Sequence, residues 1–196
     1  MKEVHLTCPL TEEAVRELNV GDVVYLSGIF YTARDMAHLR IRELLEKGEE
    51  LPIQLAGSAV FHAGPVALKD ENGKWNLNVI GPTTSIRMEP YAEMVGKLGV
   101  RAVLGKGGMA EDTLAACEKY GYVYLQAAPG CAAKLAQGIR GIKSVNWIEM
   151  GVPEAVWELD ANDFGPLVVG MDTKGHSRYA DLKKQAFAIA DEIYPK

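Results

Sequence analysis

The feature that most constrains this fold is an alternation of apolar runs and glycine-terminated helical segments in the second half of the chain. A buried strand is predicted over 100–104, an acidic-started helix over 110–120, and another strand over 122–125. This βαβ order favours an α/β chain with a mixed sheet layered with helices, although alternation alone does not separate that class from α+β. With no linker or repeat in its 196 residues, the chain is expected to form one domain, 1–196.

The first half of the chain is predicted to be richer in strands. A β-branched and aromatic run over 23–31 predicts a strand that bends at Gly28. A helix is expected over 32–48 with Thr32 as its cap, and the stretch 59–79 is expected to form antiparallel strands. Further helices are expected over 11–19, 88–98, 132–137 and 179–193, and further strands over 145–148 and 167–169.

Charge and hydropathy exclude two classes of partner. The net charge of −5 argues against sequence-independent nucleic-acid binding, which needs a basic surface. No apolar run approaches the ~20 residues that span a membrane. The N-terminus also lacks the charged-then-apolar order of a signal peptide, so we expect a cytoplasmic chain that binds neither nucleic acid nor membrane.

The cysteine pattern predicts no metal site on this chain. Cys8, Cys117 and Cys131 are odd in number and far apart, so they outline neither a disulfide framework nor a paired metal motif. An iron–sulfur cluster needs several thiolates brought together. We expect ordinary free thiols.

Three predicted junctions before helices place a cation beside glycine or hydroxyl residues. They are Arg34 in the run TARD, Arg87 in GPTTSIR and Lys106 in GKGG. Unpaired amide groups and the positive end of the helix dipole at such junctions favour anions, and an arginine can grip a carboxylate with two hydrogen bonds. The three cations together therefore fit a small dicarboxylate, since each of its two carboxylates needs a cationic group to bind it.

Simpler interpretations of these motifs remain open. Each cation taken alone could belong to a surface ion pair, for example Arg34 with Asp35. The hydroxyls of residues 83–85 could serve only as helix caps. The GKGG run lacks the order of a nucleotide-triphosphate loop, and no dinucleotide-binding glycine pattern follows a strand.

Four blocks in order carry a resemblance to a known family. The runs SGIFYTARDMAH, FHAGP, GPTTSIRM and GKGG begin at residues 27, 61, 81 and 105. Together they resemble the signature blocks of the β subunit, or C-terminal-type domain, of class I (iron–sulfur) fumarases and L(+)-tartrate dehydratases. The likeness extends from about residue 1 to residue 190.

The resemblance implies a swivelling β/β/α domain and a set of site residues. Thr83 matches the catalytic base or proton relay of the family, and Asp35 and His38 match positions that support the site. The matching substrate-binding residues are Arg34, Thr84, Arg87 and Lys106. None of these residues is expected to bind a metal.

The resemblance also implies a partner and a reaction. The chain would pair with an α subunit that carries a [4Fe-4S] cluster on three cysteines, as an α2β2 heterotetramer, and would be inactive alone. The reaction would be the reversible hydration of fumarate to L-malate. Tartrate dehydratase and mesaconase share the scaffold, and Ile86, where relatives often carry a smaller residue, leaves the substrate open. A stand-alone dicarboxylate-binding module and a purely structural subunit are the alternatives.

Overall fold

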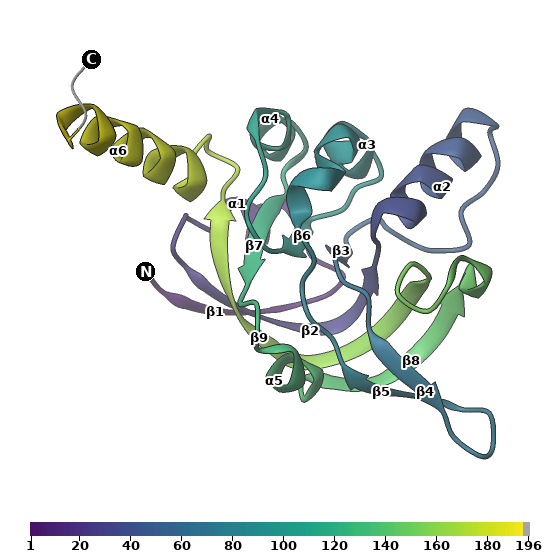
Figure 1. Ribbon diagram of the computed structural model, residues 1–196. Coiled ribbons are helices and arrows are strands. Elements are labelled where there is room, and N and C mark those ends of the chain that lie inside the picture. Colours follow the sequence, from purple (N-terminus) through teal and green to yellow (C-terminus); the bar gives the residue numbers. More distant parts are fainter. Residues whose placement is uncertain (194–196) are drawn as a thin grey trace.

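The computed structural model describes residues 1–193, and its centre is a mixed seven-stranded sheet that closes on itself (Figure 1). The strands lie in the order β1-β2-β3-β6-β7-β9-β8, and a further pairing of β2 with β9 completes a ring of five strands. Neighbours from β1 to β7 run parallel, whereas β9 is antiparallel to β2, β7 and β8. The bounds are Glu3–Thr7 (β1), Val23–Thr32 (β2), Ala59–Phe61 (β3), Ala102–Gly105 (β6), Val123–Ala127 (β7), Ile139–Asn146 (β8) and Val156–Met171 (β9).

Helices α2, α3 and α4 pack on the outside of this ring, and a separate hairpin extends from it (Figure 1). The α-helices are Glu12–Arg16 (α1), Asp35–Glu46 (α2), Ala92–Lys97 (α3), Glu111–Tyr120 (α4), Ala132–Ala136 (α5) and Arg178–Ile193 (α6). Two 3₁₀ segments are Ser85–Tyr91 (η1) and Ile148–Met150 (η2), and the hairpin pairs Val66–Lys69 (β4) with Trp75–Val79 (β5). The expected mixed sheet layered with helices is therefore confirmed.

Two apolar clusters stabilise these layers. Inside the ring, the aromatic rings of Phe30, Phe61 and Phe164 contact one another, with centroids 5.0 to 6.4 Å apart. Outside it, side chains of α2, α3 and α4 pack on the sheet, with Met88 and Tyr124 buried among them. Burial of apolar surface on both faces of the strands explains why β6 and β7 read as continuous apolar runs.

The predicted bend at Gly28 is confirmed and has a steric cause. Gly28 has φ +87°, and a Cβ atom there would lie 2.6 Å from the carbonyl oxygen of Cys8. Pairing of β2 with β9 shifts register between Leu26 and Gly28. Only glycine allows β2 to pass this close to the chain after β1.

Two expectations for the first half of the chain are wrong in detail. Thr32 does not cap a helix, because it ends β2, is buried, and accepts a hydrogen bond from the Trp157 amide at 3.1 Å. Helix α2 begins only at Asp35. In addition, β3 is not an antiparallel strand but a parallel one between β2 and β6, and the antiparallel pair is limited to β4 and β5.

The longest strand was largely missed. The sequence indicated a strand over 167–169, whereas β9 extends over 16 residues and borders three other strands. The strand β1 was not expected at all. Helix α6 forms as predicted and extends away from the body of the molecule, and no helix within residues 1–193 is long and apolar enough to cross a membrane (Figure 1).

Candidate functional site

The candidate site lies where parallel strands β2, β3 and β6 end. Arg34 and Asp35 follow β2, His62 follows β3, and Lys106 follows β6. The carboxyl ends of neighbouring parallel strands meet at one edge of a sheet, so these segments lie together although they are far apart in sequence. The segment before η1, which carries Thr83, completes the group.

Backbone hydrogen bonds hold the threonine segment between two of these strand ends. The Thr83 amide donates to the carbonyl of His62 at 2.7 Å, and the Lys106 amide donates to the carbonyl of Thr83 at 3.3 Å. The Ser85 amide donates in return to the carbonyl of Lys106 at 3.0 Å, and Thr84 forms a parallel bridge with Lys106. The structure thus places Thr83, Thr84 and Lys106 side by side.

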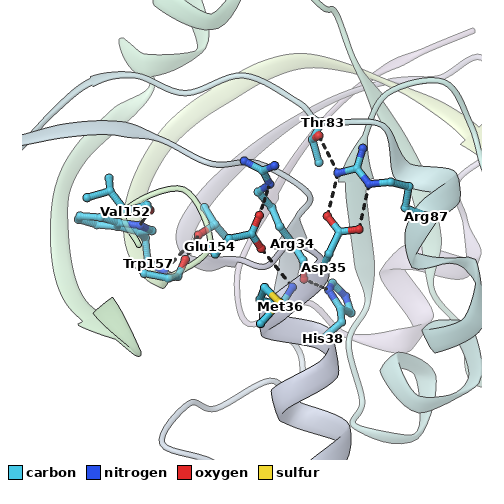
Figure 2. Close-up of polar contacts among 11 residues, drawn as sticks. Arg34, Asp35, Met36, His38, Thr83, Arg87, Val152, Glu154 and Trp157 are labelled. Carbon is cyan, nitrogen blue, oxygen red and sulfur yellow. Dashed lines mark hydrogen bonds and ion pairs between the residues drawn. The ribbon is translucent and has the colours of Figure 1, made fainter. Parts of the chain in front are cut away.

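Arg87 connects this segment to the start of α2 (Figure 2). Its Nε and Nη2 donate to the two carboxylate oxygens of Asp35 at 2.9 and 2.8 Å, and Nη2 also donates to Oγ1 of Thr83 at 3.1 Å. This hydrogen bonding lowers the pKa of Asp35 and raises the pKa of Arg87. Only Nη1 of Arg87 then remains available to a ligand. A bidentate contact of Arg87 with a ligand carboxylate would therefore require the hydrogen bonds to Asp35 to break.

The two terminal nitrogens of the Arg34 guanidinium, Nη1 and Nη2, remain available to a ligand. Its Nε lies 3.2 Å from Oε1 of Glu154, close enough for an ion pair but outside the geometry of an aligned hydrogen bond. Among residues 1–193, Nη1 and Nη2 of Arg34 form no hydrogen bond with a side chain or carbonyl. Arg34 therefore has a free pair of parallel donors, the arrangement that matches a carboxylate.

His38 supports the backbone of Arg34 from within the core. Its Nδ1 lies 2.8 Å from the carbonyl oxygen of Arg34, which can only accept, so this nitrogen carries the proton. The ring is buried against His62 and Tyr91, with both pairs of centroids 5.3 Å apart. Burial lowers the pKa of His38, which favours the neutral ring.

A buried polar cluster that the sequence did not reveal lies beneath the threonines. Oγ of Ser85 accepts a hydrogen bond from the Tyr124 hydroxyl at 3.0 Å and lies 3.0 Å from Nδ1 of His62. Burial also lowers the pKa of His62 well below its ordinary value. A Cβ on Gly105 would lie only 1.8 Å from Oγ of Ser85, so the glycine makes room for this cluster.

The model of the family described as fumarase C-terminus matches residues 1–182. The chain belongs to this family. An Escherichia coli K12 relative, the β subunit of L(+)-tartrate dehydratase, is 40% identical over 185 residues, which are 94% of this chain and 90% of that protein. A Methanocaldococcus jannaschii protein provisionally given the same name is 47% identical over 94% of this chain and 95% of its own length.

A third relative is a longer protein than this chain. A Geobacillus stearothermophilus protein, provisionally named fumarate hydratase class I, is 46% identical over 93% of this chain. The match covers only 35% of that protein. The resemblance drawn from the four sequence blocks is confirmed by all three relatives, whose names are those of hydro-lyases or their β subunits.

The side chains of this family member do not fit an iron–sulfur cluster. Within residues 1–193, no three His, Cys, Asp or Glu side chains are grouped so that they could hold a metal ion. Burial raises the pKa of the Cys8 thiol to about 11 and also raises that of Cys117, whereas Cys131 is exposed on another segment. Raised pKa values oppose the thiolate form that iron requires.

The site is an open surface rather than a closed pocket. The side chain of Arg34 is 26% exposed and that of Arg87 is 42% exposed. Lys106 is partly exposed, and its ammonium group forms no ion pair within residues 1–193. The structure therefore brings together Arg34, Asp35, Thr83, Arg87 and Lys106, with His38 behind them.

Proposed function

We propose that this chain is the β subunit of a hydro-lyase that adds water to, and removes it from, a small dicarboxylate, with fumarate and L-malate as the pair. The proposal is supported by two observations: the segments that carry Arg34, Thr83 and Lys106 lie together where β2, β3 and β6 end, and the Arg87 side chain contacts Thr83. The names of the family relatives support a hydro-lyase, and the free donor pair of Arg34 supports an anionic substrate.

The hydrogen-bond donors that remain free suggest two contacts with the substrate, one for each carboxylate. Arg34 offers Nη1 and Nη2 to one carboxylate as a parallel pair. Lys106 and Nη1 of Arg87 would meet the second carboxylate, with the Thr84 hydroxyl beside them. Fixed positive charge at these points would also stabilise the negative charge that spreads onto a carboxylate when the adjacent carbon loses a proton.

Thr83 is the proposed proton-transfer residue. Because Nη2 of Arg87 donates to Oγ1 of Thr83, the hydroxyl proton is directed away from the arginine. The nearby cation also favours the anionic form of the oxygen, which a threonine needs before it can accept a proton from carbon. Asp35 would hold Arg87 in place for both tasks, and His38 would fix the backbone of Arg34.

The partner and the cofactor are part of the same proposal. An open site that supplies only cations and a hydroxyl is suited to closure by a second chain, and the relatives named as β subunits imply an α subunit. We propose an α2β2 assembly in which the α subunit carries the [4Fe-4S] cluster and this chain acts as one swivelling domain. When bound, such a cluster supplies a Lewis acid for the departing hydroxyl.

L(+)-Tartrate is the second candidate substrate. Two relatives that match this chain over at least 90% of their own length carry the name of its dehydratase. Tartrate has the same two carboxylates and an additional hydroxyl, so the cations would bind both acids. Ile86, which is 45% exposed beside Arg87, is the residue of this chain that we expect to discriminate between them.

Reconstitution with the α subunit tests the proposal. The chain alone is expected to show no turnover of fumarate, malate or tartrate, and the assembled enzyme is expected to turn over at least one of them. Arg87→Ala should lower kcat/KM by about 10²- to 10³-fold, because it removes charge stabilisation at the site. Arg42→Ala, on the exposed part of α2 beside Glu46, is the matched control.

Two results would contradict parts of this proposal. Normal turnover by the Arg87→Ala assembly would remove the carboxylate-binding assignment. Tight binding of malate to the isolated chain, measured by calorimetry, would favour a stand-alone binding module over half of a shared site.

A further inference from the structure

A short loop that carries no recognisable motif contacts the candidate site at the edge of the sheet where β2 ends and β9 begins. Residues 151–155 form a tight turn between η2 and β9, in which the amides of Glu154 and Ala155 donate to the carbonyl of Gly151 at 3.0 and 2.9 Å. Gly151 has φ +96°, a conformation that favours glycine. The indole nitrogen of Trp157 donates to the carbonyl of Val152 at 2.9 Å and ties the loop to the core (Figure 2).

Glu154 uses both of its carboxylate oxygens on α2 and the residue before it (Figure 2). Oε1 lies 3.2 Å from Nε of Arg34, and Oε2 accepts a hydrogen bond from the Met36 amide at 3.1 Å. The side chain of Glu154 is only 20% exposed. One carboxylate thus caps the first turn of α2 and pairs with the arginine that precedes the helix.

This contact determines which edge of the Arg34 guanidinium is free. A guanidinium can present a carboxylate with either Nε and Nη2 or the terminal pair Nη1 and Nη2. Glu154 occupies the Nε side, so the terminal pair is left. Gly64 makes room for the guanidinium beside the same loop, because a Cβ there would lie 2.7 Å from Nη1 of Arg34 and 2.7 Å from the carbonyl oxygen of Pro153.

We propose that Glu154 is a positioning residue that holds Arg34 with its terminal donor pair turned toward a substrate carboxylate. The proposal rests on the proposed function, because it requires Arg34 to bind that carboxylate. Asp35 holds Arg87 in a comparable way, but from within α2 itself. Glu154 comes from a loop 120 positions later in the sequence, so the position of Arg34 depends on the closure of the ring by β9.

The alternative is that Glu154 only caps α2. A cap would stabilise the helix whether or not Arg34 is present, whereas a positioning residue acts through Arg34. The two roles are separated by comparing the same substitution in two backgrounds, with and without the arginine.

The experiment measures kcat and KM of the enzyme assembled from this chain and the α subunit. Glu154→Ala is expected to raise KM for the dicarboxylate about tenfold with a smaller change in kcat, because Arg34 would grip a carboxylate present in the ground state and transition state alike. Glu154→Gln retains an acceptor for the Met36 amide and should give an intermediate KM. In the Arg34→Ala background, Glu154→Ala should add less than about twofold.

The matched control is Glu149→Ala. Glu149 lies in η2, just before the same loop, and forms an ion pair at 2.5 Å with Arg40, which lies further along α2 than Met36. It should leave KM and kcat unchanged. Thermal melts of every variant show which of them fold.

Three outcomes would overturn the positioning role. The first is an unchanged KM in Glu154→Ala. The second is an equal rise in KM when Glu154→Ala is made in the wild-type chain and in the Arg34→Ala chain, which would indicate that Glu154 only caps α2. In either case a wild-type enzyme that turns over dicarboxylate leaves the proposed function standing. If the wild-type assembly turns over no dicarboxylate, both proposals fail together.

Discussion

The candidate site has two layers with opposite character. The outer layer is charged and exposed, and its ion pairs, Arg87 with Asp35 and Arg34 with Glu154, link residues whose side chains are 20 to 42% exposed. The inner layer is uncharged and buried, and consists of Ser85, His62 and Tyr124. Exposed ion pairs contribute little stability, whereas a buried polar group without its partner is costly. We therefore expect the inner layer to affect folding and the outer layer to affect chemistry.

The strongest test of the inner layer is Gly105→Ala. The new Cβ would lie 1.8 Å from Oγ of Ser85 and 3.3 Å from the Tyr124 hydroxyl, so Ser85 would have to move and its buried partners would lose their hydrogen bonds. Overpacking together with a lost buried hydrogen bond should lower the free energy of unfolding by about 3 kcal/mol. Denaturant titration of the chain measures this change.

The control for this prediction is another strand glycine, Gly141 in β8. A Cβ added to Gly141 would meet no heavy atom within 4 Å, and the residue has no left-handed φ. Gly141→Ala should therefore change stability by less than about 0.5 kcal/mol. Equal stabilities for the two variants would show that the Ser85 cluster tolerates displacement, and would remove the distinction between the layers.

The pH dependence of stability tests the same layer with a smaller effect. Burial lowers the pKa of His38 and His62, so the unfolded chain binds protons that the folded chain does not once the pH falls below about 6.5. Stability should therefore be complete above pH 6.5 and decline as the pH falls toward 5. His62→Gln should reduce this slope by up to about 1.4 kcal/mol per pH unit.

His5 provides an opposite control. Hydrogen bonds to Asp163 and Glu3 raise its pKa, so its contribution is present below pH 6.5 and is lost as the pH rises through the higher folded value. His5→Gln should therefore leave the loss of stability toward acid pH unchanged or make it steeper. A slope that stays the same in His62→Gln would mean that the buried ring takes up a proton as readily as the unfolded chain does.

The difference between the layers also explains what the sequence could predict. Arg34, Arg87 and Lys106 each stand beside glycine or hydroxyl residues before a predicted helix, and that local signal made them candidates, whereas Thr83 was singled out only by the family resemblance. The bend of β2 at Gly28 and the helix over 179–193 were likewise predicted from local pattern. The roles of the site residues remain predictions.

The missed features all depend on pairing between distant segments. Strand β9 pairs with three strands and was recognised in only three of its positions, because the run DANDFGP in its middle is rich in residues that are typical of turns and depleted in strands. Glu154 follows a Gly-Val-Pro turn that indicates only a loop. Tyr124 lies in a correctly predicted strand, but its hydrogen bond to Ser85 requires the three-dimensional fold.

In the outer layer, Asp35→Asn is expected to change stability only slightly. Asp35 holds Arg87 by two hydrogen bonds, yet the pair is about 40% exposed, so its loss should lower the free energy of unfolding by less than about 1 kcal/mol. In the assembled enzyme the same substitution should lower kcat/KM about tenfold or more, because Arg87 would no longer be fixed against Thr83. Asp160→Asn, which breaks the pair with Arg140 in β8, should leave turnover unchanged. If Asp35→Asn instead unfolds the chain while turnover per folded molecule stays normal, the outer layer is structural and the carboxylate-binding role assigned to Arg87 is wrong.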